Sequence, residues 1–185
     1  DKDLCLASFL RAAREAGPAM SVIFLNDGPL PEERVRRMAP AGEVLAAKGL
    51  GNGGSYRRAL DLGLEHAREP HDLIYLSEDD YLFLPDAFTQ LLQAAAAIPE
   101  ADYLSLYDHP DRYLRTDDAD GGRTRIFLGG GRHWRSVEST CLSFAARRPA
   151  LAADVQLHRN MAMEEIPDDR GLWRRLQGLG AQRLL

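Results

Sequence analysis

The chain has 185 residues, of which 45% are hydrophobic and 28% charged, a composition typical of a single globular domain with a sizeable core. The formal net charge of −5 at pH 7 excludes the strongly basic surface with which proteins bind nucleic acid or anionic membranes. No run approaches the about 18 apolar residues of a membrane span. The two cysteines, Cys5 and Cys141, form neither a metal-binding spacing nor a disulfide framework, which favours a cytoplasmic location.

Hydrophobic periodicity predicts alternating helices and strands through the first 107 residues. In chain order we expect a helix over 4–16, a strand over 20–25, one or two helical turns over 32–38, a short strand over 43–47, a helix over 56–68, a strand over 73–76, a helix over 85–98 and a strand over 102–107. Such alternation predicts an α/β fold with a mostly parallel wound sheet and right-handed crossovers.

The pattern changes after residue 107. A polar loop is expected first, then two strand-like runs that we predict to be antiparallel additions to the sheet, then two helices. Their ranges are 108–123 for the loop, 124–128 and 137–145 for the strands, and 149–155 and 169–179 for the helices. The whole chain, 1–185, is interpreted as one domain with halves that meet near residue 107.

Three consecutive acids, Glu78, Asp79 and Asp80, directly follow the buried strand over 73–76 and precede a helix. The carboxyl ends of strands in open α/β sheets are where ligands bind. Carboxylates this close repel one another, so they stay ionised together most easily around a hard cation such as Mg²⁺ or Mn²⁺. A solvated acidic turn is the alternative.

A glycine-rich segment, Gly51–Ser55, leads into the helix expected over 56–68. Such a segment can offer backbone N–H groups to a phosphate. It lacks the spacing of a dinucleotide fingerprint and the lysine of a P-loop. The alternative is a plain flexible connector.

Three motifs in order carry a resemblance: a strand that ends in Asn26-Asp27-Gly28, the Gly49–Ser55 segment that opens a helix, and a strand that ends in Glu78-Asp79-Asp80. Together they resemble a GT-A fold glycosyltransferase, closest to the family-2-like group, over about residues 20–107. The resemblance implies a Rossmann-like GT-A domain whose first half, to about 107, binds a nucleotide sugar. The second half, from about 108, would face the acceptor.

The resemblance also implies an activity and its residues. The chain would move a sugar from a nucleotide-diphosphate donor to an unknown acceptor hydroxyl, with a divalent cation, Mn²⁺ or Mg²⁺, and with inversion expected. Glu78 and Asp80 would hold the cation. The expected donor contacts are Asp27, Asn52, Gly53, Ser55, Asp79 and an arginine, Arg57 or Arg58, of which we take Arg58.

Inverting enzymes need a carboxylate that deprotonates the acceptor hydroxyl. The candidates are Glu164, Glu165, Asp168 and Asp169, and we choose Asp168 first and Asp169 second. Asp168 could equally cap the following helix, with Asp169 in its first turn. Two other functions stay open: a non-catalytic nucleotide-sugar-binding or interaction module, and a sugar-nucleotidyltransferase.

Overall fold

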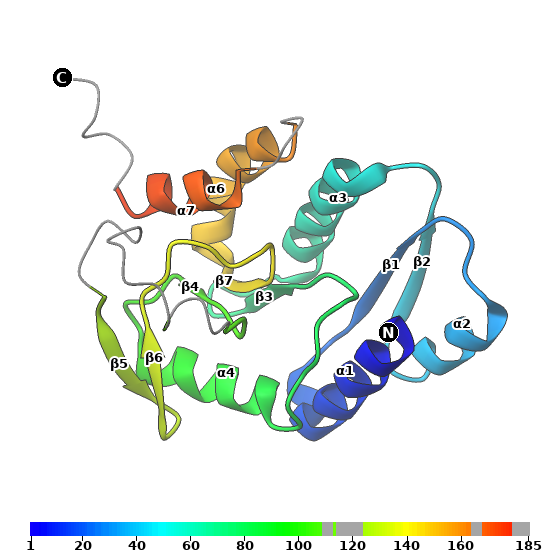
Figure 1. Ribbon diagram of the computed structural model, residues 1–185, viewed down its shortest axis with the longest axis horizontal. Helices are drawn as coiled ribbons and strands as arrows, with labels where there is room; N and C mark the ends of the chain where they lie inside the picture. The colour runs from blue at the N-terminus through cyan, green and yellow to red at the C-terminus, as the bar shows by residue number, and fades with distance from the viewer. Residues whose placement is uncertain (109–112, 114–123, 164–167, 179–185) are drawn as a thin grey trace.

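The computed structural model describes residues 1–108, 113, 124–163 and 168–178. Its elements in chain order (Figure 1) are α1 (Lys2–Ala16), η1 (Gly17–Ala19), β1 (Ile23–Asp27), α2 (Glu32–Met38), β2 (Glu43–Ala47), α3 (Gly51–His66), β3 (Leu73–Leu76), α4 (Ala87–Ala97), β4 (Tyr103–Leu104), β5 (Ile126–Gly129), β6 (Arg132–Arg135), β7 (Phe144–Arg147), α6 (Arg148–Met161) and α7 (Asp169–Leu176). Among the described residues no helix is both long and apolar enough to cross a membrane.

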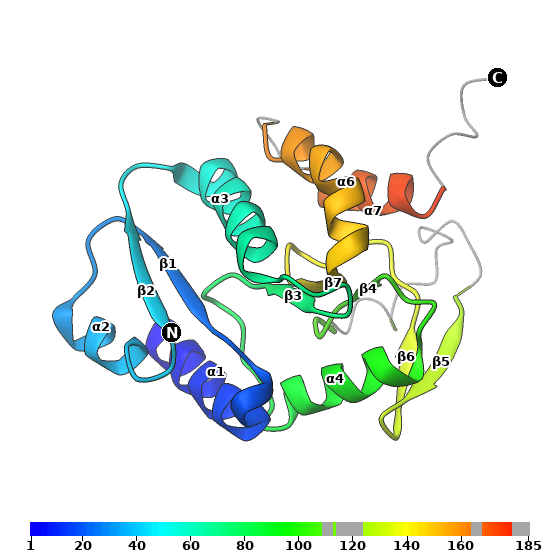
Figure 2. The ribbon, with the colours of Figure 1, turned by 180° about the vertical axis from the view of Figure 1, so that it is seen from behind.

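The described strands form three separate sheets. β1 pairs in parallel with β2, and α2 makes the crossover between them. β3, β7 and β4 form the second sheet in that order, and β5 and β6 form an antiparallel hairpin. Figures 1 and 2 show α1 and α4 on one side of the central strands, and α3, α6 and α7 on the other.

The predicted mostly parallel wound sheet of a Rossmann-like GT-A fold is wrong, because the only parallel sheet among the described residues has two strands. β7 comes from late in the chain, yet it lies between β3 and β4 and runs antiparallel to both. Its first three residues, Phe144, Ala145 and Ala146, have no exposed surface. A strand that is apolar on both faces is most stable in the middle of a covered sheet, and this burial outweighs the local order of strands in the sequence.

Strands predicted from short apolar runs fall into two groups. Those at 43–47 and 73–76 are confirmed, as are the helical turns at 32–38. In the second half the predicted bounds are less accurate: the run at 137–145 contributes only its end to β7, and β6 forms where a connecting segment was expected. β5 pairs with β6 instead of joining the central sheet.

Two apolar clusters hold the layers together. Beneath the sheet, Phe9 of α1 meets Phe24, Phe83 and Phe88 edge to face, with ring centroids 5.5–5.8 Å apart. Above the sheet, a second cluster joins α3, α6 and α7 to the central strands through Leu60, Leu151, Phe144 and Trp173. The two clusters fix the helices that border the cleft described next.

Candidate functional site

A cleft of about 790 Å³ lies between β1 and β3, with α1 bordering one side and α3 the other. Every residue predicted to hold the donor or the metal lines this cleft, except Arg58: Asp27, Asn52, Gly53, Ser55, Glu78, Asp79 and Asp80. They come from the end of β1, the start of α3 and the turn after β3. The fold therefore brings together three segments that are far apart in the sequence.

The acid turn, residues Glu78–Asp80, is the strongest negative feature of the cleft. Partial burial raises the pKa of the Glu78 carboxyl, and repulsion by Asp80, Asp79 and Asp169 raises it further. Asp79 is compensated by Lys2, whose ammonium lies 2.7 Å from Asp79 Oδ2. A cation near Glu78 and Asp80 would relieve the remaining repulsion.

The acid turn does not by itself form a closed metal cage. Among the described residues no group of three or more His, Cys, Asp or Glu side chains is arranged to hold a metal ion. Mg²⁺ in phosphate-binding sites commonly takes only one or two carboxylates and completes its shell with water and substrate phosphates. Glu78 and Asp80 fit this open type of site. That they bind a cation together stays a prediction, because the phosphates of the donor would have to complete the coordination shell.

Asp27 ties the end of β1 to the start of α3. Its Oδ2 accepts a hydrogen bond from the Gly51 backbone N–H at 2.8 Å. The backbone N–H groups of Leu50 and Gly51 lower the pKa of Asp27, with smaller contributions from Gly49 and Ser55. A carboxylate is thus already stabilised at this helix N-terminus, where the helix dipole favours negative charge.

The glycine-rich segment is helical, not a connector, because α3 begins at Gly51. Gly51 has φ +65°, a conformation that favours glycine. Gly53 lies so close to α6 that a Cβ atom there would be only 2.2 Å from the Ala162 carbonyl oxygen. Gly53 is therefore required for helix packing, whatever else it contacts. Only the packing of α3 against the end of α6 identifies Gly51–Ser55 as the start of a helix, because its glycines by themselves predict a flexible loop.

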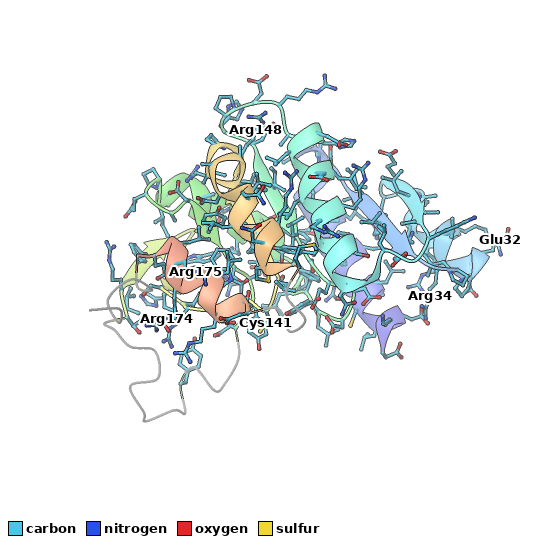
Figure 3. The ribbon with its side chains drawn as sticks, turned by 90° about the horizontal axis from the view of Figure 1, so that it is seen from above. Glu32, Arg34, Cys141, Arg148, Arg174 and Arg175 are labelled. Atoms are coloured by element: carbon cyan, nitrogen blue, oxygen red, sulfur yellow. The ribbon has the colours of Figure 1, made fainter. Side chains whose placement is uncertain are left out.

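Arg58 lies outside the cleft. Its guanidinium donates to Glu65 Oε1 at 3.1 Å, on the exposed side of α3. Two cations that the sequence did not single out line the cleft instead, Lys2 of α1 and Arg34 of α2. Arg34 donates to Asp3 at 2.9 Å. Figure 3 labels Arg34 on the α2 side of the molecule. No local pattern distinguishes these residues, because packing of α1 and α2 brings them to the cleft.

Asp168 and Asp169 do not line the cleft and are engaged in hydrogen bonds. Asp168 is the N-cap of α7 and accepts from the Gly171 backbone N–H at 2.8 Å. Asp169 accepts from the backbone N–H groups of Thr140 at 3.0 Å and Cys141 at 3.2 Å, and from Trp173 Nε1 at 2.7 Å. The two other candidates, Glu164 and Glu165, lie outside the described residues.

The loop that Asp169 holds, residues 139–142, borders the cleft. Cys141 and Leu142 have positive φ angles of 49° and 58°, which are unusual for residues with side chains. Leu142 lines the cleft, and the Tyr81 hydroxyl, next to the acid turn, donates to the Cys141 carbonyl at 2.8 Å. Figure 3 shows Cys141 beside α7. Asp169 therefore acts on the cleft by positioning this loop.

Comparison with protein-family models, with curated proteins and with solved structures gives no match for the chain. The function is therefore inferred from the residues of the cleft.

Proposed function

We propose that the chain is a metal-dependent glycosyltransferase that moves a sugar of hexose type from a nucleotide-diphosphate donor to an acceptor hydroxyl. The observation that carries this proposal is the meeting of two opposite features in one cleft. The acid turn attracts a cation, and the start of α3 can offer the backbone N–H groups of Asn52 and Gly53 to phosphate, since that of Gly51 is already bonded to Asp27. A cation-bound diphosphate needs both features.

The same residues suit the chemistry of glycosyl transfer. The transition state resembles an oxocarbenium ion, and the leaving diphosphate gathers negative charge. A divalent cation, Mn²⁺ or Mg²⁺, held by Glu78 and Asp80 would neutralise that charge. By the resemblance of the three motifs to those of family-2-like glycosyltransferases, Asp27 would contact the nucleoside, and reaction with inversion is expected.

A non-catalytic nucleotide-sugar-binding module is the second candidate. The observation that favours it is the state of the two predicted bases, because Asp168 caps α7 and Asp169 holds the 139–142 loop. Both carboxylates are engaged in these hydrogen bonds, so neither is free to take a proton from an acceptor hydroxyl in this conformation. Transfer by this chain would then need Glu164, Glu165 or a released Asp168 as the base.

Calorimetry with nucleoside diphosphates tests donor binding. We expect one of UDP, GDP and dTDP to bind in the presence of Mn²⁺, and Asp80→Ala to weaken that binding at least about tenfold, or ~1.4 kcal/mol. Glu100→Ala is the matched control, since Glu100 is an exposed acid that does not line the cleft. Binding that is independent of both Mn²⁺ and Asp80 would refute the proposed site.

Hydrolysis of the matching nucleotide sugar separates the enzyme from the binding module. An enzyme releases free sugar slowly when water replaces the acceptor, and Asp80→Ala abolishes this release. Tight, metal-dependent binding without any release over hours would favour the binding module.

The free thiols of Cys5 and Cys141 suit a reducing compartment, and we propose the cytoplasm. Cell fractionation with an antibody to the chain checks this location.

A further inference from the structure

Two cations line the cleft on the side of α1 and α2. They are Lys2, the first residue of α1, and Arg34 in α2, and among the described residues no other positively charged side chain lines the cleft. Neither belongs to the three motifs on which the donor site was predicted. The side chains of Lys2 and Arg34 are 60% and 30% exposed, so a ligand in the cleft can reach both.

The two cations lie close to each other and to the acid turn. The Lys2 ammonium donates to Asp79 Oδ2 at 2.7 Å, and this hydrogen bond is the main cause that raises the pKa of Lys2. The charges of Asp79 and Asp80 raise that pKa further, while the charge of Arg34 lowers it. Because charges act on one another in this way only at short range, both cations belong to the same mouth of the cleft as the acid turn.

Each cation is held by an acid and keeps donors to spare. Arg34 directs Nε and Nη2 to the two carboxylate oxygens of Asp3, at 2.9 and 3.2 Å, so Asp3 occupies one edge of the guanidinium. Its Nη1 group makes no hydrogen bond to another described residue. The Lys2 ammonium has three N–H groups and uses one for Asp79. Cations that are already positioned lose less side-chain freedom when they bind a ligand.

The charges of the cleft indicate which ligand the two cations suit. Four carboxylates line the cleft, and when all are ionised they exceed the two cations by two charges. A divalent cation would balance this excess, so a bound diphosphate would gain direct attraction from side chains only at Lys2 and Arg34. An ammonium binds phosphate as a point charge, and a guanidinium binds it with a fork of N–H donors.

We propose that Lys2 and Arg34 bind the diphosphate of the donor from the α1–α2 side of the cleft. This inference rests on the proposed function, since it assigns two further side chains to the same ligand. Lys2 and Arg34 would donate to the phosphate oxygens that are not bound to the divalent cation at the acid turn. Asp79 and Asp3 are then positioning residues, each of which holds one of the two cations.

A purely structural role of Lys2 predicts a different effect of its removal. If Lys2 only neutralised the acid turn, loss of its charge would strengthen the attraction for a divalent cation. Binding of a cation-bound diphosphate would then stay equal or become tighter. If Lys2 binds phosphate, loss of its charge weakens that binding even when the divalent cation is saturating.

Calorimetry with inorganic pyrophosphate at saturating Mg²⁺ separates the two roles without a nucleoside. We expect Lys2→Met and Arg34→Gln each to weaken pyrophosphate binding about threefold or more, and both together about tenfold or more. Lys48→Met and Arg37→Gln are the matched controls, because they remove the same charges outside the cleft, and Arg37 also contacts Asp3. Both controls should bind within about twofold of the wild type. Circular dichroism confirms that the variants fold.

Acylation of lysines, followed by mass spectrometry, locates the ligand in the wild-type chain. Lys2 and Lys48 are its only lysines, so Lys48 is an internal control. Pyrophosphate with Mg²⁺ should slow acylation of Lys2 about threefold or more and leave Lys48 unchanged.

The inference and the proposed function can fail separately. Pyrophosphate binding that depends on Asp80 but is equal or tighter in Lys2→Met and Arg34→Gln would overturn the inference and leave the donor site standing. Unchanged acylation of Lys2, or no binding of pyrophosphate to the wild type, would overturn it as well. If the variants weaken pyrophosphate binding but UDP, GDP and dTDP bind no more tightly than pyrophosphate, the two phosphate contacts are supported and the nucleotide donor is refuted.

Discussion

The buried histidine of α6, His158, should make the folded protein less stable as the pH falls. His158 has no exposed surface, and its ring stacks on Phe144 with centroids 5.3 Å apart. Its Nδ1 is 2.7 Å from the Tyr56 hydroxyl, and its Nε2 is buried with no hydrogen-bond partner among the described residues. Burial lowers the pKa of His158 from 6.5 to about 4, against weaker opposing attraction from Asp154 and Asp169.

Folding stability decreases as the pH falls, because the unfolded chain binds a proton on His158 at a higher pH than the folded chain does. As pH falls below 6.5, the unfolded chain protonates His158 while the folded chain does not, so folding stability is lost between pH 6.5 and about 4. With these two pKa values the loss between pH 7.5 and pH 5 is about 2 kcal/mol. For a domain of this size, this corresponds to a decrease in Tm of roughly 4–8 °C.

The perturbation is the double substitution Tyr56→Phe with His158→Phe. Removing both hydrogen-bond partners together leaves no buried polar group behind, so the cost at pH 7.5 should be below about 1.5 kcal/mol. Urea unfolding at pH 7.5 and pH 5 should show a pH-dependent loss about 2 kcal/mol smaller than in the wild type. Because other groups such as Glu78 titrate equally in both proteins, the difference isolates His158.

A matched control and a direct titration complete the test. His66→Gln is the matched control, because the His66 side chain is half-exposed whereas that of His158 is buried. The His158 ring signal in NMR spectra should titrate near pH 4. If the double variant lost as much stability at pH 5 as the wild type, the folded protein would accept the proton on His158 without cost, and the lowered pKa of His158 would be refuted.

Three further outcomes follow from hydrogen bonds and packing. Asp169→Asn should lower the free energy of unfolding by about 2–4 kcal/mol in urea, since the 139–142 loop loses a charged acceptor. Asp168→Ala loses only a helix cap and should cost about 1 kcal/mol. Equal costs would contradict the assigned roles. Gly53→Ala should lower Tm by several degrees, because its Cβ would clash with the Ala162 carbonyl oxygen. Gly54→Ala would meet only Leu50 Cβ at 3.1 Å and should change Tm little. An unchanged Tm in Gly53→Ala would show that α3 and α6 can move apart freely. Arg147→Met should speed amide exchange at the end of α4, because Arg147 donates to the Ala95 and Ala101 carbonyl oxygens at 2.6 and 3.0 Å, and unchanged exchange would contradict this capping role.

Local features of the sequence were sufficient for most elements of the first half. The strand Leu73–Leu76 and the helix Ala87–Ala97 were predictable because apolar spacing and the turn residues between them are properties of neighbouring residues. The meeting of Asp27, the start of α3 and the acid turn was also expected, since each follows a strand of the single sheet that the sequence predicted, although β1 and β3 lie in separate sheets.

The tertiary structure alone decided how the strands pair and what the acids contact. β7 lies between β3 and β4 because burial of Phe144, Ala145 and Ala146 is a non-local gain that no short pattern encodes. Asp169 looked like a free carboxylate at a helix start, yet it binds the loop at Thr140 and Cys141, about thirty residues earlier. Short patterns set the elements because they depend on neighbouring residues, whereas pairing and hydrogen-bond partners depend on which distant surfaces bury one another best.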